Sequence, residues 1–270
     1  MEMDNLYAQT NSINSLAKTD LNYNDLVSQA FFAKGEEKKQ LLEELSAVGI
    51  YCFSTNSTNS INESTSSDAS SDHNDEIMPN GLAIYPACGT TDVTIYAPEI
   101  YYQASNRTWI VSCGGQWNNG KALPTFSLFE TNIGDPDAFG VGYTSIKTAY
   151  NSSIVQAYAY IADHIGSQKV TTNYRSDGNG SLGFGFRLQD RQLSTPNFTT
   201  YIGHIWYGAC TYDEQFASFD AVATGFYTHT YSSATITDVT FGVQGKNAGV
   251  NVALSDMKKG FTGYGADTKF

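Results

Sequence analysis

The stretch SLGFGFRLQ at residues 181–189 decides the fold class of this chain. Leu182, Phe184, Phe186 and Leu188 occupy alternate positions, and Gly or Arg stands between them. Successive side chains of a β-strand point to opposite faces of the sheet, so this period of two predicts a strand with one buried and one exposed face.

The same alternation recurs over the C-terminal two thirds of the chain. A β-hairpin is predicted around the turn 244–249, with Val239, Phe241 and Val243 before it and Val250, Val252 and Leu254 after it. Further strands are predicted at 92–102, 109–113, 139–145, 153–161, 170–175, 203–212 and 221–231. About ten short strands without a long helical pattern between them indicate a mainly β protein, an antiparallel β-sandwich of the jelly-roll or immunoglobulin-like type.

Residues 20–49 have a helical period and predict a short helical hairpin. Leu26, Ala30 and Phe31 lie on one side of the first helix, which ends at Gly35. The second helix is expected over 36–48, with glutamates in its first turn and leucines at helical spacing. Helices this short are not stable alone, so we expect the hairpin to dock on the body of the protein or on a partner.

A polar tract separates the helices from the strands. Of the 23 residues in 54–76, 15 are Ser, Thr or Asn, and five are acidic, with no Lys or Arg. Such a segment has too little apolar surface to offset its loss of conformational entropy, so it predicts a disordered linker. We therefore expect an N-terminal helical segment at 1–53 (accessory or pro-segment), a linker at 54–80 and an all-β domain at 81–270.

The net charge of −12 is concentrated in the N-terminal part. Residues 1–80 contain 13 acidic and 4 basic residues, a balance of −9, whereas 81–270 contain 14 and 11, a balance of −3. An acidic chain without a Lys/Arg cluster does not attract a phosphate backbone, so no nucleic-acid partner is expected. No transmembrane segment is predicted, because no stretch approaches the roughly 20 apolar residues of a spanning helix. The oligomeric state is not predicted.

The state of the cysteines depends on the cellular compartment, so the two are considered together. The acidic N-terminus lacks the features of a secretory signal and, taken as it stands, indicates a cytosolic protein. Only 16% of the residues are charged, and the abundance of Ser, Thr, Asn and Tyr favours an exported protein whose signal has been removed. The spacing of Cys52, Cys88, Cys113 and Cys210 disfavours a zinc site. Their even number permits disulfides, with Cys88–Cys113 preferred, and four buried thiols are the alternative.

Three further stretches carry a resemblance. LSAVGIY at 45–51, NRTWIVSCGG at 106–115 and RSDGNGSLGFGF at 175–186 resemble, in this order, a group of secreted β-rich proteins of Gram-positive bacteria. That group has no assigned activity or catalytic residues. The resemblance therefore implies export and a β fold, and no specific reaction.

One turn is a candidate calcium site. Asp177, Asn179 and Ser181 present oxygen atoms at alternate positions, as ligands do in acidic Ca²⁺ loops, and no other cofactor is predicted. The remainder of an EF-hand is missing, and a turn held by side-chain-to-backbone hydrogen bonds explains the same residues. The letters GNGSLG at 178–183 match a dinucleotide-binding pattern, but they lead into a strand rather than a helix, which favours a hairpin turn.

No catalytic set can be assembled from the sequence. Asp213 and Glu214 are adjacent, so in a strand they would point to opposite faces. The other candidates are isolated: the carboxylates Glu99, Asp135, Asp137 and Asp163 and the histidines His73, His164, His204 and His229. The sequence thus favours a protein that is not an enzyme, with a hydrolase of unrecognised type as an alternative.

Aromatic residues with polar tips are the most abundant candidates for ligand binding. The candidates share strand faces in three sets: Tyr158 with Tyr160, Tyr227 with Tyr231, and Trp206 with Tyr212. Sugars stack their C–H faces on such rings and bond their edges to polar groups, although aromatic residues also fill sandwich cores. The favoured hypothesis is a secreted β-sandwich surface protein that binds a glycan or cell-envelope component. A β-pore-forming toxin is the other alternative, suggested by the Ser/Thr-rich hairpin at 234–255.

Overall fold

The predicted strand at 181–189 is β11 (Gly183–Leu188), and its Phe184 and Phe186 are fully buried. The computed structural model describes residues 23–53, 76–77, 84–85, 90–118, 131–147, 152–194, 199–231 and 234–270. Within them the chain is mainly β, and every strand pair is antiparallel, as the alternating pattern predicts.

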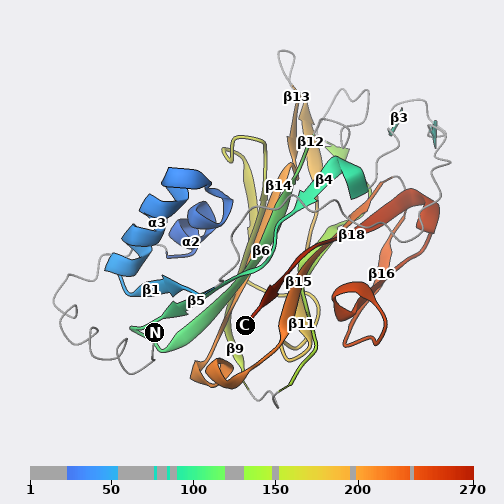
Figure 1. Cartoon of the computed structure of the whole chain (residues 1–270). Coiled ribbons are helices and arrows are strands. Elements are labelled where there is room, and N and C mark those ends of the chain that lie inside the picture. The colour runs from blue at the N-terminus through green and yellow to red at the C-terminus, as the bar shows by residue number, and fades with distance from the viewer. Residues whose placement is uncertain are drawn as a thin grey trace.

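Two sheets form the body of the sandwich (Figure 1). The larger has seven strands in the order β1-β5-β6-β14-β9-β10, with β4 also paired to β6. Its strands are β1 (Ile50–Cys52), β4 (Val93–Ile95), β5 (Glu99–Gln103), β6 (Thr108–Trp117), β9 (Ile154–Ala162), β10 (Lys169–Thr172) and β14 (Ile205–Tyr212). The smaller has the order β11-β8-β15-β18, with β8 (Asp137–Thr144), β15 (Val222–Thr230) and β18 (Gly260–Lys269) beside β11.

The main core lies between these sheets. Trp206 of β14 stacks on Tyr227 of β15, with ring centroids 3.9 Å apart and planes 12° apart. Gly208 of β14 faces Phe139 and Phe186, and a Cβ at this position would lie 2.7 Å from the Phe186 ring. The glycine therefore makes room for two phenylalanines, which is why an aromatic-rich core closes tightly here.

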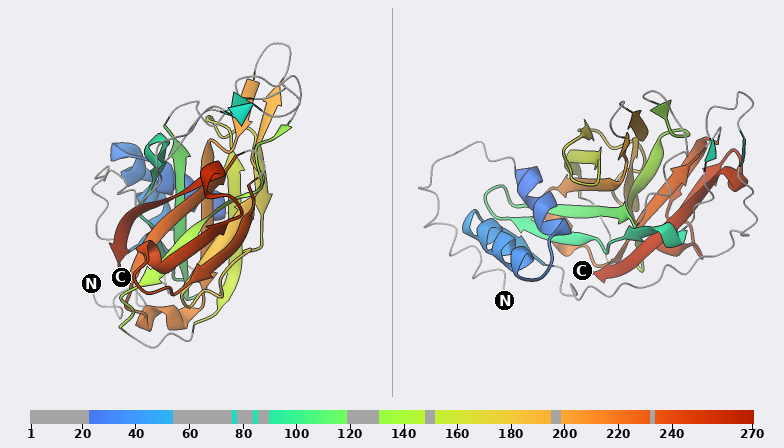
Figure 2. Two further views of the ribbon diagram at one scale, coloured as in Figure 1. Left: turned by 90° about the vertical axis from the view of Figure 1, so that its right-hand side faces the viewer. Right: turned by 90° about the horizontal axis from the view of Figure 1, so that it is seen from above.

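Two outer layers cover the sandwich (Figures 1 and 2). The helices α2 (Tyr23–Phe32) and α3 (Gly35–Ala47) confirm the predicted hairpin, which docks on the face of the seven-stranded sheet that points away from the main core. The predicted C-terminal hairpin is also confirmed, as β16 (Ile236–Phe241) paired with β17 (Val250–Leu254). It covers the outer face of the four-stranded sheet through Val239 and Val250.

Smaller elements lie at the ends of the sandwich. A three-stranded sheet has the order β13-β12-β7, and a two-residue pair joins β2 to β3. These strands are β2 (Glu76–Ile77), β3 (Ile84–Tyr85), β7 (Thr131–Asn132), β12 (Arg191–Ser194) and β13 (Thr199–Ile202). Short 3₁₀ turns lie at Thr90–Asp92, Glu214–Ser218, Asn247–Gly249 and Met257–Lys259. Apart from β2, the predicted linker at 54–80 lies outside the described residues.

The preferred disulfide, Cys88–Cys113, is not formed. Cys113 carries a free thiol that is buried in β6 between the sheets, and burial raises its pKa above the usual value. Cys88 lies outside the described residues, among which no disulfide is present. Cys210, on the neighbouring strand β14, is likewise a buried free thiol. These two thiols thus behave as small core side chains.

Neither α2 nor α3 combines the length and the apolar run that a helix needs to cross a bilayer, and this holds for all helices in the described part of the chain.

Candidate functional site

A group of tyrosines lies on the outer side of the seven-stranded sheet, and we call it the tyrosine face: Tyr96, Tyr158, Tyr160 and Tyr207. Tyr160 of β9 lies directly opposite Tyr207 of β14, with ring centroids 5.5 Å apart. Tyr158 lies two residues before Tyr160 on the same side, at 6.1 Å. Strand alternation and register thus bring three rings together on one face.

The helix α2 covers part of this face. Phe31 contacts Tyr96 and Tyr207, with ring centroids 6.0 and 5.6 Å away. Tyr160 and Tyr207 are buried, whereas Tyr96 and Tyr158 are only half-buried at the margin of the helix. Burial raises the pKa of Tyr160 to about 12 and that of Tyr207 well above its usual value. Both hydroxyls therefore remain protonated at neutral pH and can donate hydrogen bonds.

Polar groups accompany the rings. Lys38 of α3 forms an ion pair with Glu99 of β5, and Glu99 also accepts a hydrogen bond from the hydroxyl of Tyr101. The Lys38 and Glu99 side chains are only 13% and 10% exposed. A hydrogen bond of 3.0 Å joins the Ser112 and Tyr207 hydroxyls. Since removal of one partner leaves a nearly buried charge uncompensated, the ion pair ties the helical hairpin to the sheet.

The structure divides the six predicted ligand-binding rings between two environments. Tyr158 and Tyr160 belong to the tyrosine face. Trp206, Tyr212, Tyr227 and Tyr231 are buried in the main core. Tyr212, for example, stacks on Phe216 at 4.7 Å. These four rings fill the sandwich and present no exposed platform, because Trp206 and Tyr212 of β14 face the four-stranded sheet while Tyr227 and Tyr231 face back from that sheet.

The candidate calcium turn uses its oxygens within the protein. The two carboxylate oxygens of Asp177 accept hydrogen bonds from Arg187 at 2.8 and 2.9 Å. Asn179 Oδ1 accepts from the backbone N–H and the hydroxyl of Ser181, at 3.1 and 2.8 Å. Hydrogen bonds and an ion pair therefore account for the residue types in this turn.

Two further acidic candidates from the sequence, Asp163 and Asp213, accept hydrogen bonds that stabilise local turns. Asp163, at the end of β9, accepts hydrogen bonds from Ser167 and from the backbone N–H of Gln168. Asp213 accepts from Ser152 and from the backbone N–H of Gln215, at the start of a 3₁₀ turn. Each carboxylate thus stabilises a turn, and neither forms a pair with a second acid in these contacts.

A second polar group is buried inside the sandwich, and we call it the Asp/His cluster: Asp137, Asp190 and His229. Asp137 begins β8, and His229 lies near the end of the adjacent strand β15. Asp137 pairs with Leu188 of β11, and Asp190 follows two residues later. The cluster therefore forms at one end of the four-stranded sheet, on its inner face.

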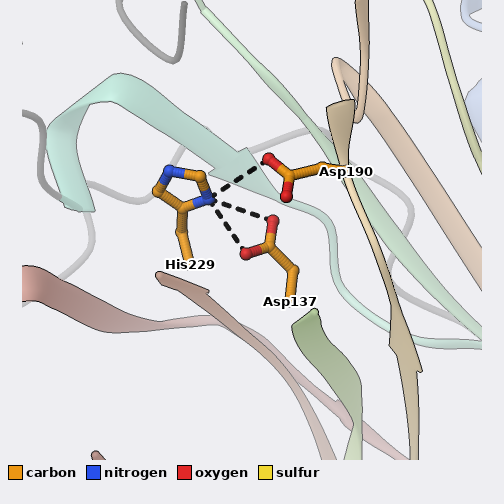
Figure 3. Close-up of side chains that lie close together, drawn as sticks. All are labelled: Asp137, Asp190 and His229. Atoms are coloured by element: carbon orange, nitrogen blue, oxygen red, sulfur yellow. Dashed lines mark hydrogen bonds and ion pairs between the residues drawn. The ribbon is translucent and has the colours of Figure 1, made fainter. Parts of the chain in front are cut away.

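The side chains of the cluster lie close together and are buried from solvent. The Nδ1 atom of His229 lies 3.0 Å from both oxygens of Asp137 and 3.8 Å from Oδ2 of Asp190 (Figure 3). All three residues are at most 2% exposed. Burial, together with the neighbouring charge of Asp137, raises the pKa of Asp190 well above its ordinary value. Two carboxylates thus share a site that cannot easily hold both of their charges without a cation.

Further hydrogen bonds orient the carboxylates. The hydroxyl of Tyr227 donates to Oδ2 of Asp137 at 2.6 Å, and the backbone N–H of Thr230 donates to Oδ1 at 3.1 Å. The hydroxyl of Tyr201 donates to Oδ2 of Asp190 at 2.7 Å. Sequence reasoning considered Asp137 and His229 separately and did not find Asp190. No local pattern marks this cluster, because its members come together only through strand register.

Comparison of the chain with protein-family models, with curated proteins and with solved structures finds no match.

Proposed function

We propose that this chain is an extracellular β-sandwich surface protein that binds a glycan of the cell envelope on its tyrosine face. The observation that carries the proposal is the gathering of Tyr158, Tyr160 and Tyr207 on one sheet face, beside Ser112 and Glu99. The low charge of the chain and its resemblance to secreted β-rich proteins support the location outside the cell.

The chemistry of the face suits a sugar. A pyranose ring stacks its C–H face on an aromatic ring, and its hydroxyls need donors and acceptors at the edge of that ring. The tyrosine hydroxyls are donors and acceptors, and a carboxylate such as Glu99 accepts from sugar hydroxyls.

The helical hairpin acts as an adjustable cover in this proposal. It occupies the centre of the tyrosine face through Phe31 and leaves Tyr158 half-exposed. The ion pair between Lys38 and Glu99 holds the cover in place. Ligand binding at the centre requires the hairpin to move aside, whereas Tyr158 offers a stacking surface at its margin.

The first experiment tests the cover in the full-length protein. Lys38→Met removes one partner of the ion pair, so we expect binding of peptidoglycan fragments or chito-oligosaccharides to strengthen severalfold, as measured by calorimetry. Lys39→Met is the matched control, because Lys39 forms an exposed ion pair with Glu36 of the same helix. Equal binding by the two variants would contradict the claim that the hairpin competes with the ligand for the tyrosine face.

The second experiment tests the rings. Tyr158→Ala should weaken binding about fivefold, corresponding to roughly 1 kcal/mol of stacking, with little loss of stability. Tyr174→Ala is the control, since Tyr174 is 81% exposed and lies outside the tyrosine face. If no sugar binds to the wild type or to Lys38→Met, the proposal is wrong. Dye release from liposomes by the same proteins would instead support a pore-forming protein.

A further inference from the structure

We propose that Asp137, Asp190 and His229 form a binding site for one divalent transition-metal ion, of the Zn²⁺ or Mn²⁺ class. The proposal does not depend on glycan binding, because the cluster lies in the interior of the sandwich, on the other side of the seven-stranded sheet from the tyrosine face.

The spacing of the donor atoms fits a shared metal ion. Nδ1 of His229 and one oxygen from each carboxylate all lie within 4.8 Å of one another. Ligand atoms at about 2.0–2.2 Å from a tetrahedral or octahedral metal are separated from each other by on the order of 3 Å. Nδ1 lies 3.0 Å from an oxygen of Asp137 and 3.8 Å from an oxygen of Asp190, which is close to the separation of two ligand atoms on one ion.

The two sides of the imidazole ring give an independent argument. Figure 3 places Nε2 on the side of the ring away from both carboxylates. This atom is buried and has no hydrogen-bond partner among the described residues. The rings around His229 are those of Trp117, Tyr231 and Phe261, with centroids 5.0, 6.0 and 5.9 Å away.

A metal ion on Nδ1 requires the tautomer with its proton on Nε2, and the aromatic surroundings can accept that N–H group. The faces of aromatic rings are negative, so they attract an N–H group and repel a bare lone pair. A neutral imidazole with its proton on Nε2 points the lone pair of Nδ1 at the two carboxylates. In this tautomer three electron-rich atoms converge on one point, and a cation between them compensates their negative charge. A metal ion in this position compensates both carboxylates.

The hydrogen bonds around the cluster match those of established metal sites. Carboxylate ligands are usually held by outer hydrogen bonds, and Tyr227, Tyr201 and the N–H of Thr230 supply them here. The Tyr227 and Tyr201 hydroxyls donate at 2.6 and 2.7 Å, and these contacts fix the orientation of the two carboxylates.

The donor set selects the class of metal. One imidazole and two carboxylates suit Zn²⁺, Mn²⁺ or Fe²⁺. Calcium prefers six to eight oxygen ligands, which is more than these residues provide. Because the three ligands are almost fully buried, we infer a metal that holds β8, β11 and β15 together at this end of the sheet.

The test uses tag-free, full-length protein stripped of metal by a chelator. Titration with Co²⁺ should give visible absorption bands of a nitrogen- and oxygen-ligated ion at one equivalent per chain. Zn²⁺ should displace Co²⁺ and raise the melting temperature. A wild-type protein that binds neither ion above the level of a histidine-free blank protein would overturn the proposal.

Variants locate the site. Asp190→Asn keeps the shape of the side chain and can accept from Tyr201, and it should weaken Co²⁺ binding at least tenfold and abolish the Zn²⁺-dependent shift in melting temperature. His204→Gln is the control, because His204 contacts His164 at 6.2 Å, outside the cluster, and it should bind metal like the wild type. Binding that is lost in His204→Gln and retained in Asp190→Asn would place the metal elsewhere and refute the assignment. If Asp190→Asn does not fold, the melting temperatures of the wild type and of His204→Gln are compared with and without chelator. An equal fall in both proteins supports a metal at the cluster. No fall in either protein refutes it.

Discussion

The two faces of the seven-stranded sheet carry the same kinds of side chain and differ in what covers them. On the inner face, Trp206 and Tyr212 pack against the four-stranded sheet, which is part of the sandwich itself. On the outer face, Tyr160 and Tyr207 lie beneath a two-helix hairpin held partly by a salt bridge. A ring under a second sheet contributes to global stability, whereas a ring under a short hairpin can be uncovered without unfolding the sandwich.

The largest expected effect is on the inner face. Trp206→Ala removes a ring that is 1% exposed and stacked on Tyr227. We expect it to lower the free energy of unfolding by about 3–5 kcal/mol, because a large cavity is left in the core. Urea denaturation measures this loss, and a loss below about 1 kcal/mol would show that the inner face is not the core.

The corresponding outer variant is Phe31→Ala. Phe31 is also buried, at 5% exposed, and contacts Tyr96 and Tyr207. We expect a smaller loss, about 2 kcal/mol, because local undocking of the hairpin limits the cost of the cavity. Hydrogen exchange should accelerate in α2 and α3 and stay unchanged in β8 and β15. Acceleration throughout the sandwich would erase the distinction between the two faces.

Tyr207→Phe isolates the polar component of the outer face. The change removes the hydroxyl that is hydrogen-bonded to Ser112 and keeps the ring. A buried hydrogen bond of this type contributes about 1 kcal/mol, so the midpoint of urea denaturation should fall modestly. Ser112→Ala in the same background should cost little more, since the two hydroxyls act as one pair.

The smallest effect depends on pH and concerns Asp163, which follows the end of β9 in the same sheet. Burial raises the pKa of this carboxyl, but hydrogen bonds from Ser167 and Gln168 outweigh burial, and the pKa is lowered overall. A group with a lowered folded-state pKa stabilises the protein above its unfolded pKa of about 4, and this contribution is lost as the pH falls through the folded value. Asp163→Ala should therefore cost at most about 1 kcal/mol at pH 7, and the cost should fall steadily as the pH is lowered toward 2. An equal cost at both pH values would contradict this account.

The elements that could be predicted share a strong local signal. The helices at 23–47 and the hairpin of β16 and β17 have clear periods and clear turns. The strand β18 was not predicted, although it is ten residues long and eight of its residues pair with β15. Its Gly263 and Gly265 leave room for Ile95 of β4: a Cβ at Gly263 would lie 3.0 Å from the Ile95 side chain, and one at Gly265 would lie 2.8 Å from the Ile95 carbonyl oxygen. The alternating apolar pattern is therefore missing from this strand because of tertiary packing against β4.

The candidate sites show the same limit. Alternation correctly placed Tyr158 with Tyr160 and Tyr227 with Tyr231. It could not tell which of Trp206 and Tyr207, neighbours on opposite faces of β14, is the core residue. The ring chosen from the sequence fills the core, and its unchosen neighbour lies on the tyrosine face. The sequence of β14 does not show which layer will cover each of its faces, because the covering helices and strands come from distant parts of the chain.

By itself the sequence determined the strand periods, the helical hairpin and the antiparallel β class, because these follow from interactions between residues close in the chain. Only the tertiary structure decided which face of each strand is core, and only strand register brought Asp190 to Asp137 and His229. Register and layer order depend on packing between segments far apart in sequence, and a period of two is the same on either side of a sheet.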